Sequence, residues 1–361
     1  MKTASMLWMI FISSSLHSQT AFYKVFTGNI MGAEALAHLH ISNGHIGGYL
    51  YLVRDPRPFI LYPESSVWKK DSLIIYSSRS YQISVNLSAA GDQQKFQGTA
   101  VMYQDDKEIR KGNIMLQEVR DPYMALTFFS TAGKAALPAS LKNESECTYA
   151  ASSIWPVKED NSPVAVNIRK IFYQEFNLPP GKDPSSLLPA AQQKYLTDWK
   201  NTHVKAGVKE TENMGLSLSQ DQHDRLMVLS ESQTLLTLAA YHYQFTGGAH
   251  GNYSTDLICF DKRNGKRLKL ADVLTAQGIS ALPAMLTKAA KSQFNLKNNQ
   301  TLEQAGFFKS NVPVTQNFWV DNAGLGFWYQ PYEIGPFAYG EIVLFIPLSQ
   351  LSTYIQPTFL K

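Results

Sequence analysis

The residues best suited to chemistry lie in a glycine-rich stretch near the middle of the second half of the chain. This stretch contains His250 together with Gly247, Gly248 and Gly251, and it separates two runs that are typical of strands. Glycine accepts positive φ and allows close backbone approach, so the turn could present its amides and His250 to a ligand. The alternative is a bulged strand connection in which the glycines serve only geometry. No Gly-Lys-Ser/Thr follows, so the stretch is not a phosphate loop.

A second stretch interleaves aromatic residues, prolines and glycines from Trp328 to Glu341. This composition resists regular structure. A rigid aromatic loop suits contact with a ligand or partner, because tyrosine offers a large surface at a small cost in conformational entropy. We therefore predict Tyr332 and Tyr339 as binding residues.

A hydrolase site is the alternative interpretation of the same two stretches. His250 would act as the acid/base, and Glu333 or Glu341 would be the partner carboxylate. The hypothesis requires these groups to lie in one cleft. The chain contains no Gly-x-Ser-x-Gly and no His-Glu-x-x-His, so no nucleophile or metalloprotease motif supports catalysis.

Three histidines fall on one face of a predicted hairpin around Asn43 and Gly44. Such a pair favours a two-residue turn, which would oppose Ser42 with His45. His38, His40 and His45 then share a face with Tyr49 and Tyr51, and could bind zinc or copper. The alternative is a wetted sheet face. The opposite face is apolar and should meet a core, with Ala37, Leu39, Ile41, Ile46, Leu50 and Leu52.

The elements that must position these residues divide the chain into two parts. Alternating short runs over 21–130 predict an antiparallel β-rich domain, as a meander, a sandwich or an open barrel. Small polar residues over 131–148 predict a linker. The pattern over 149–361 predicts an α+β domain with a mixed sheet and three or four helices. The fold class is therefore α+β.

Helix and strand signals in the second part are clear. Ser162-Pro163 and Asp183-Pro184 both predict a helix start, because proline suits the first helical position. A third helix is predicted over 279–294, and a short closing helix near Leu348. The predicted strands are 225–230, 234–245, 253–260, 316–320, 325–329 and 341–347.

Composition limits the class of protein. The chain has 361 residues, of which 44% are hydrophobic and 17% charged, so it can form real cores. A net charge of +4 does not indicate nucleic-acid binding. Two cysteines exclude a disulfide scaffold and a four-cysteine zinc site, and they leave open whether Cys147 and Cys259 pair. No motif calls for a cofactor.

The N-terminus is typical of an export signal. Lys2 precedes an apolar core over Met6–Ile12, and small residues then lead to a cleavage point before Gln19. We predict a signal peptide over 1–18, the alternative being an N-terminal helix or a disordered start. The apolar run is far shorter than the roughly 20 residues of a spanning helix. The mature chain is therefore expected to be periplasmic or secreted and without a membrane span.

The second part contains a series of short motifs: Tyr241–Gly251, Phe260-Asp261, Asn264-Gly265, Leu268–Leu274, Gly324–Tyr329, Pro331–Gly340 and Ile346-Pro347. In this order they resemble a bacterial extracytoplasmic family, the domain of unknown function 3298, and its upstream partner domain, 4163. The 4163-like part would cover about 147–245 and the 3298-like part about 246–352. The resemblance implies an α+β fold. It also implies similarity to the extracellular part of an anti-sigma factor that binds lysozyme.

These observations predict an exported, non-catalytic binding protein. Its partner would be a cell-envelope glycan, a wall-active protein such as lysozyme, or another secreted protein. The contacts would come from the Gly247–Gly251 turn and the Tyr332–Tyr339 loop. Two alternatives remain: a hydrolase of envelope glycan or peptide, and an interaction module in which the motifs serve only packing.

Overall fold

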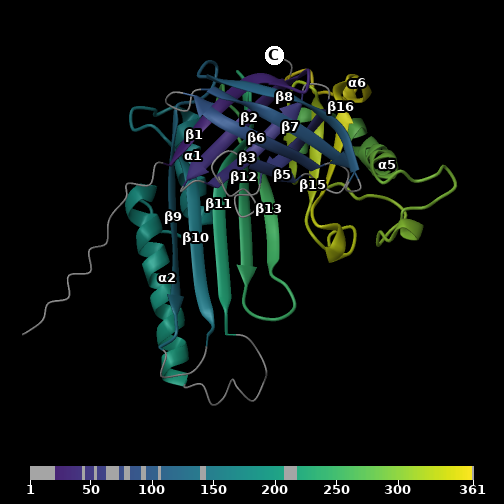
Figure 1. The fold of residues 1–361 in the computed structure, drawn as a ribbon. Coiled ribbons are helices and arrows are strands. Elements are labelled where there is room, and N and C mark those ends of the chain that lie inside the picture. Colours follow the sequence, from purple (N-terminus) through teal and green to yellow (C-terminus); the bar gives the residue numbers. More distant parts are fainter. Residues whose placement is uncertain are drawn as a thin grey trace, which may run out of the picture.

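The structure is a computed structural model that describes residues 21–42, 45–52, 55–61, 73–76, 82–90, 95–104, 107–138, 144–206 and 218–359. Three sheets follow one another along the chain, and helices accompany the second and third (Figure 1). The predicted order, an antiparallel β-rich part followed by a mixed sheet with helices, is confirmed. The predicted signal peptide lies outside the described residues. No helix in the described ranges is long and apolar enough to cross a membrane.

The first sheet is antiparallel, and its strand order is β4-β3-β2-β1-β8-β7-β6-β5. Its strands are β1 (Phe22–Ile30), β2 (Ala33–Ser42), β3 (His45–Leu52), β4 (Asp55–Leu61), β5 (Leu73–Tyr76), β6 (Gln82–Ala90), β7 (Lys95–Gln104) and β8 (Lys107–Val119). Ser42 pairs with His45 as the turn signal predicted. The Asn43-Gly44 pair itself lies outside the described residues.

The predicted apolar face of this hairpin is buried in the core of the first sheet. The sheet curls so that distant strands share that core, and the rings of Phe26 in β1 and Phe96 in β7 lie 4.8 Å apart. The buried hairpin residues are Ala35, Ala37, Leu39, Ile41, Ile46, Leu50 and Leu52. Alternation with a period of two therefore identified the core face correctly.

The second sheet has five strands in the order β13-β12-β11-β10-β9. They are β9 (Leu126–Ala136), β10 (Glu146–Pro156), β11 (Gln220–Glu231), β12 (Leu235–Phe245) and β13 (Asn252–Asp261). Only β10 and β11 are parallel, so the sheet is mixed. The predicted linker over 131–148 needs correction, because β9 and β10 extend into it and pair with each other. The small residues at the end of β9 lie under α2, and Gly133 there lies directly against Gln192 of this helix.

Two helices, α1 (Pro163–Glu175) and α2 (Pro184–Ala206), connect the parallel strands. The Ser162 hydroxyl accepts the N–H of Ala165 at 3.3 Å and caps α1, as predicted. The apolar stripe of α1 packs on the second sheet, while α2 lies along β9 and β10 (Figure 1). The remaining strands of the sheet extend beyond this cover.

The third sheet contains β14 (Phe318–Val320), β15 (Gly324–Tyr329) and β16 (Ile342–Pro347). It packs with α4 (Leu270–Val273), α5 (Ala276–Gln293) and α6 (Leu348–Leu351) around a separate core. Five α-helices thus occur in the described ranges, and α4 and α6 have four residues each. Cys147 and Cys259 are buried in different cores and are both free thiols.

The histidine face of the first sheet is a docking surface against the second sheet. His38 and His40 are 0% and 2% exposed, so the expected wetted face is wrong. The Tyr23 hydroxyl lies 2.9 Å from His38 Nδ1, and the Val228 N–H donates to His40 Nε2 at 3.1 Å. Burial lowers the pKa of His38 to about 3 and also lowers that of His40, so both rings are neutral.

A β-bulge explains why this docking works. The register of β11 against β12 shifts between Val228 and Ser230, and the bulge turns backbone groups away from the sheet. His40 accepts the Val228 N–H, and the Tyr51 hydroxyl donates to the Leu229 carbonyl at 2.9 Å. The metal hypothesis has no support in the described part of the chain, where no three His, Cys, Asp or Glu side chains are grouped so that they could hold a metal ion. The His45 side chain lies outside the described residues.

Candidate ligand-binding site

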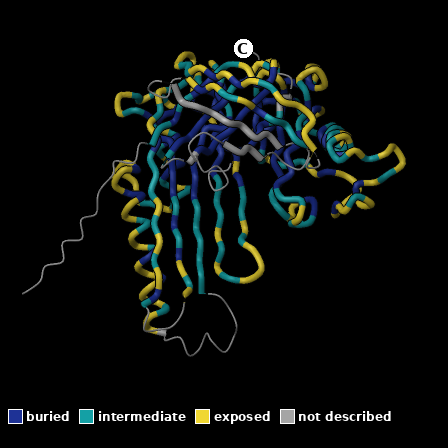
Figure 2. The backbone as a smooth tube through the Cα atoms, viewed as in Figure 1, coloured by how far each residue is buried: buried dark blue, intermediate teal, exposed yellow. Residues whose placement is uncertain are grey.

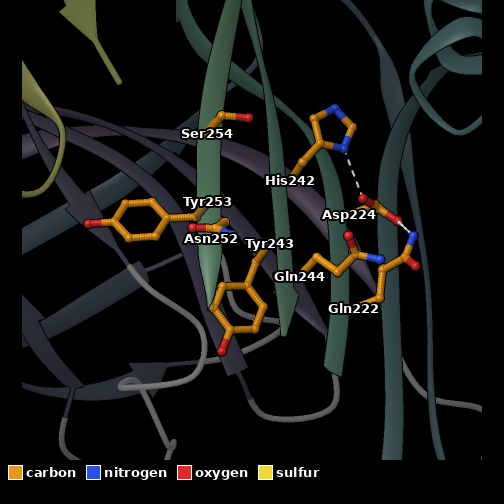
Figure 3. Close-up of a pocket in the computed structure, with 8 residues that line it drawn as sticks. All are labelled: Gln222, Asp224, His242, Tyr243, Gln244, Asn252, Tyr253 and Ser254. Carbon is orange, nitrogen blue, oxygen red and sulfur yellow. Dashed lines mark hydrogen bonds and ion pairs between the residues drawn. The ribbon is translucent and has the colours of Figure 1, made fainter. Parts of the chain in front are cut away.

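A pocket of about 320 Å³ lies on the part of β11, β12 and β13 that the helices leave uncovered. Figure 2 shows these strands changing from buried near the first sheet to half-buried and exposed towards their far ends. The lining residues are Gln222, Asp224, His242, Tyr243, Gln244, Asn252, Tyr253 and Ser254 (Figure 3). The pocket is therefore formed by the sheet surface itself.

Strand register arranges the polar side chains in two rows across the sheet. The first row contains Gln222, Gln244 and Asn252, which are direct cross-strand neighbours. The second row contains Asp224, His242 and Ser254. Since side chains at every second position share a face, both rows lie on the face that packs against α1 further along. The pocket is the polar continuation of a buried apolar face.

His242 is the electrostatic centre of the pocket. Its Nδ1 lies 2.8 Å from Asp224 Oδ1, and its Nε2 lies 3.3 Å from Glu175 Oε2 in the last turn of α1. The hydrogen bonds to Asp224 and then Glu175 raise the pKa of His242 to about 9. The ring is therefore an imidazolium at neutral pH. Gln222 also donates to Asp224, at 2.6 Å, and fixes that carboxylate.

This arrangement does not provide a general base. Ser254 is the cross-strand neighbour of His242, which resembles a Ser-His-Asp set. Both ring nitrogens of His242, however, bond to carboxylates, and in Figure 3 the ring points towards Asp224. A protonated ring with both nitrogens in use cannot take a proton from a hydroxyl. The arrangement can hold polar groups in place.

Two tyrosines flank the rows on the side of α2. Tyr149 of β10 is the direct neighbour of Gln222, and its ring centroid lies 5.3 Å from that of Tyr195 in α2. Burial raises the pKa of both phenols, for Tyr195 to about 12, and the charge of Asp224 contributes to both shifts. The two packed rings therefore border the first polar row on the side of α2.

The two predicted loops meet on the opposite face of the same hairpin. The rings of His250 and Phe337 stack at 3.8 Å, and the ring of Tyr332 lies 5.5 Å from Phe337. Gly247 and Gly248 have φ values of +96° and +99°, which glycine accepts without strain. The sequence motifs thus form one exposed aromatic cluster, defined here as His250, Tyr332 and Phe337.

Other predicted residues have structural roles. Tyr339 packs against Phe294 and Phe307 at the core of the third sheet, and its hydroxyl donates to the Ala305 carbonyl. Gly251 lies against the Tyr243 ring, where a Cβ would come within 2.6 Å. Both therefore support the loops, and their predicted role in binding stays a prediction.

The proposed catalytic carboxylates are not paired with His250. Glu333 accepts the Gln330 N–H at 2.8 Å, and His250 Nδ1 bonds to the Gly251 carbonyl at 3.0 Å. Glu341 is 7% exposed, and burial raises its pKa to about 7. Among the described side chains, no hydrogen bond or ion pair joins His250 to either carboxylate. The geometry therefore does not assemble the hydrolase set.

Sequence reasoning missed the residues that line the pocket. Polar residues occur at every second position at the ends of two strands, as Gln222 and Asp224 in β11 and as His242 and Gln244 in β12. This alternation on the face that packs against α1 was the only signal of the pocket in these two strands. Glu175 gave no signal, because it lies 67 residues before His242. Only the fold brings the end of α1 to the sheet.

Comparisons with known proteins place part of the chain in a family. Residues 271–349 match the family described as "Protein of unknown function (DUF3298)". This similarity covers the region of the third sheet, and the pocket lies before the matched segment. No curated protein matches the chain. The 4163-type part and the similarity to the anti-sigma factor stay predictions.

Two solved structures are similar to this chain. A DUF3298 family member from Bacteroides fragilis aligns with a TM-score of 0.56 and 23% identity, over 66% of this chain and 96% of that one. A DUF3298 family protein from Pseudomonas aeruginosa aligns with a TM-score of 0.44 and 18% identity, over 65% of this chain and 96% of that one. The first similarity shows a shared fold.

Proposed function

We propose that the protein is an exported, non-catalytic binding protein, and that its ligand is a hydroxyl-rich polymer such as a cell-envelope glycan. The observation that carries this proposal is the pair of polar rows beside Tyr149 and Tyr195. Export rests on the signal-like sequence at the N-terminus.

The chemistry of the rows suits a sugar. The amides of Gln222, Gln244 and Asn252 each offer a donor and an acceptor, which is what a hydroxyl group requires. Tyr149 and Tyr195 close one end of the rows, where Tyr149 is buried and Tyr195 is half-buried against it, so the contacts with a sugar come from the polar side chains. A few convergent polar groups beside aromatic side chains are typical of ligand sites.

The charges of the pocket disfavour polyanions. Asp224 and Glu175 surround His242, so two carboxylates face one imidazolium. Asp256 lies further along β13, where burial and the charge of Glu175 raise its pKa. Since carboxylates outnumber the positive charge, a phosphate-rich polymer would be repelled, whereas a neutral or amine-bearing glycan would not.

Thermal-shift and pull-down measurements test the proposal with soluble peptidoglycan fragments and neutral polysaccharides. We expect at least one glycan to raise the melting temperature, and Gln244→Ala to abolish the shift, because this exposed side chain belongs to the first row. Gln193→Ala, also exposed but paired with Thr197 within α2, is the matched control and should bind normally. Cleavage of the fragments, or glycan binding unaffected by Gln244→Ala, would refute the proposed site or its non-catalytic role.

A further inference from the structure

The rows in the pocket run across the strands rather than along them. Gln222, Gln244 and Asn252 occupy one register line on β11, β12 and β13. Neighbouring strands lie about 4.8 Å apart. This spacing is close to the length that one pyranose ring adds to an extended 1,4-linked chain, so the line offers one amide for each successive ring.

The two ends of the line differ. At one end, Tyr149 of β10 continues the line, and α2 covers β9 and β10 on this face and brings the ring of Tyr195 against Tyr149. At the other end, β13 is the edge strand of its sheet, so nothing in that sheet extends the line beyond Asn252. The line is therefore closed at the tyrosines and open at the edge, and Figure 1 shows α2 beside β9 and β10, with β13 at the other side of the sheet.

We propose that the site binds the end of an extended glycan chain, with one sugar ring on each of β11, β12 and β13. The terminal ring lies on Gln222, where the packed pair of Tyr149 and Tyr195 closes the line, the second ring lies on Gln244, and the third lies on Asn252. Asp224 and His242 form the second row behind these rings, where the two carboxylates hold the imidazolium in one orientation. The rest of the polymer leaves over the edge of β13. This inference rests on the proposed function and specifies its ligand.

The inference predicts a dependence on chain length. A single ring would use only Gln222, whereas three rings would use the whole line. Affinity should therefore rise by at least about tenfold from one ring to three, since each additional ring adds hydrogen bonds to a preformed site. Beyond three or four rings the molar affinity should stop rising, because only one end of each chain fits.

Calorimetry with 1,4-linked N-acetylglucosamine oligomers of one to six units provides the test. We expect Asn252→Ala to weaken binding of the trimer and longer oligomers while leaving the dimer unchanged. Gln244→Ala should weaken the dimer as well. His250→Ala, on the other face of the hairpin, is the control and should alter neither.

The outcomes separate the two levels of the proposal. Binding that depends on Gln244 but is equal for one and three rings would overturn the end-on arrangement and leave the proposed function standing. Molar affinity that keeps rising to six units would overturn the closed end at the tyrosines. If no oligomer and no envelope glycan binds, the proposed function itself fails.

Discussion

His40 and His242 lie on opposite faces of the five-stranded sheet and are in opposite electrostatic states. His40 comes from the first sheet, is 2% exposed and accepts a backbone N–H, so its ring stays neutral. His242 belongs to the sheet itself and lies between two carboxylates, so its ring is charged. The comparison shows that partners, rather than residue type, decide whether a histidine serves docking or a polar site.

The two environments link stability to pH with opposite signs. The folded pKa of His38 and of His40 lies below the unfolded value of about 6.5, so their contribution is complete above that pH and is lost as the pH falls. The folded pKa of His242, about 9, lies above the unfolded value. Its contribution is complete below about pH 6.5 and is lost as the pH rises through 9.

The largest expected effect on stability is at the contact between the first and the second sheet. His40→Ala removes a buried ring and leaves the Val228 N–H without its acceptor. We expect the free energy of unfolding to fall by about 3 kcal/mol at pH 8, from the cavity and the unpaired donor together. Urea unfolding measures this change. A loss below about 1 kcal/mol would mean that the two sheets are not held together here.

The second prediction concerns His242, the charged histidine of the pocket. We expect the difference in unfolding free energy between the protein and His242→Gln to shrink by about 2 kcal/mol from about pH 6 to about pH 9. The value allows for solvent screening of a side chain that is 30% exposed. Unfolding titrations at several pH values provide the measurement. A difference that is constant across this range would show that His242 is not an imidazolium in the folded protein.

These two sites also show what the sequence could and could not predict. Alternation placed His38 and His40 on one face and Leu39 on the other, and the register of the hairpin followed from its turn. The fate of the histidine face depended on Val228, which lies 188 residues after His40. The pattern of residue types along one strand contains no information about a β-bulge in another sheet.

The loops and the pocket give the same lesson at the other end of the sheet. Glycines and aromatics identified the loops of His250 and Tyr332, and the fold brings them together. The sequence did not predict the pocket, because glutamine and aspartate are common on exposed strand faces. Only the register of three strands brings these side chains into rows. Local composition finds unusual backbone, whereas cross-strand rows appear only with the register.

A third substitution, with a smaller expected effect on the free energy of unfolding, tests the hydrogen bond at the bulge without changing the packing around it. Tyr51→Phe keeps the ring but removes the donor to the buried Leu229 carbonyl, and we expect a loss of about 1 kcal/mol. Tyr173→Phe is the exposed comparison, since its hydroxyl donates to the Lys182 carbonyl at the same 2.9 Å distance and also accepts the Gly181 N–H at 3.2 Å. Chemical denaturation compares the two variants. Equal losses of unfolding free energy in the two variants would indicate that burial does not increase the contribution of the Tyr51 hydrogen bond to stability.

The smallest effect is expected for a third histidine, which belongs to neither environment. His250 is exposed and stacks on Phe337, so His250→Ala should cost about 0.5 kcal/mol. Since the aromatic cluster lies on the face opposite the two polar rows, next to Tyr253, we also expect the variant to bind glycan as the unmodified protein does. Parallel denaturation and thermal-shift measurements test both parts. Normal stability with lost glycan binding would move the contact surface to the aromatic cluster, because a side chain that supports only its own loop cannot remove a ligand from the other face.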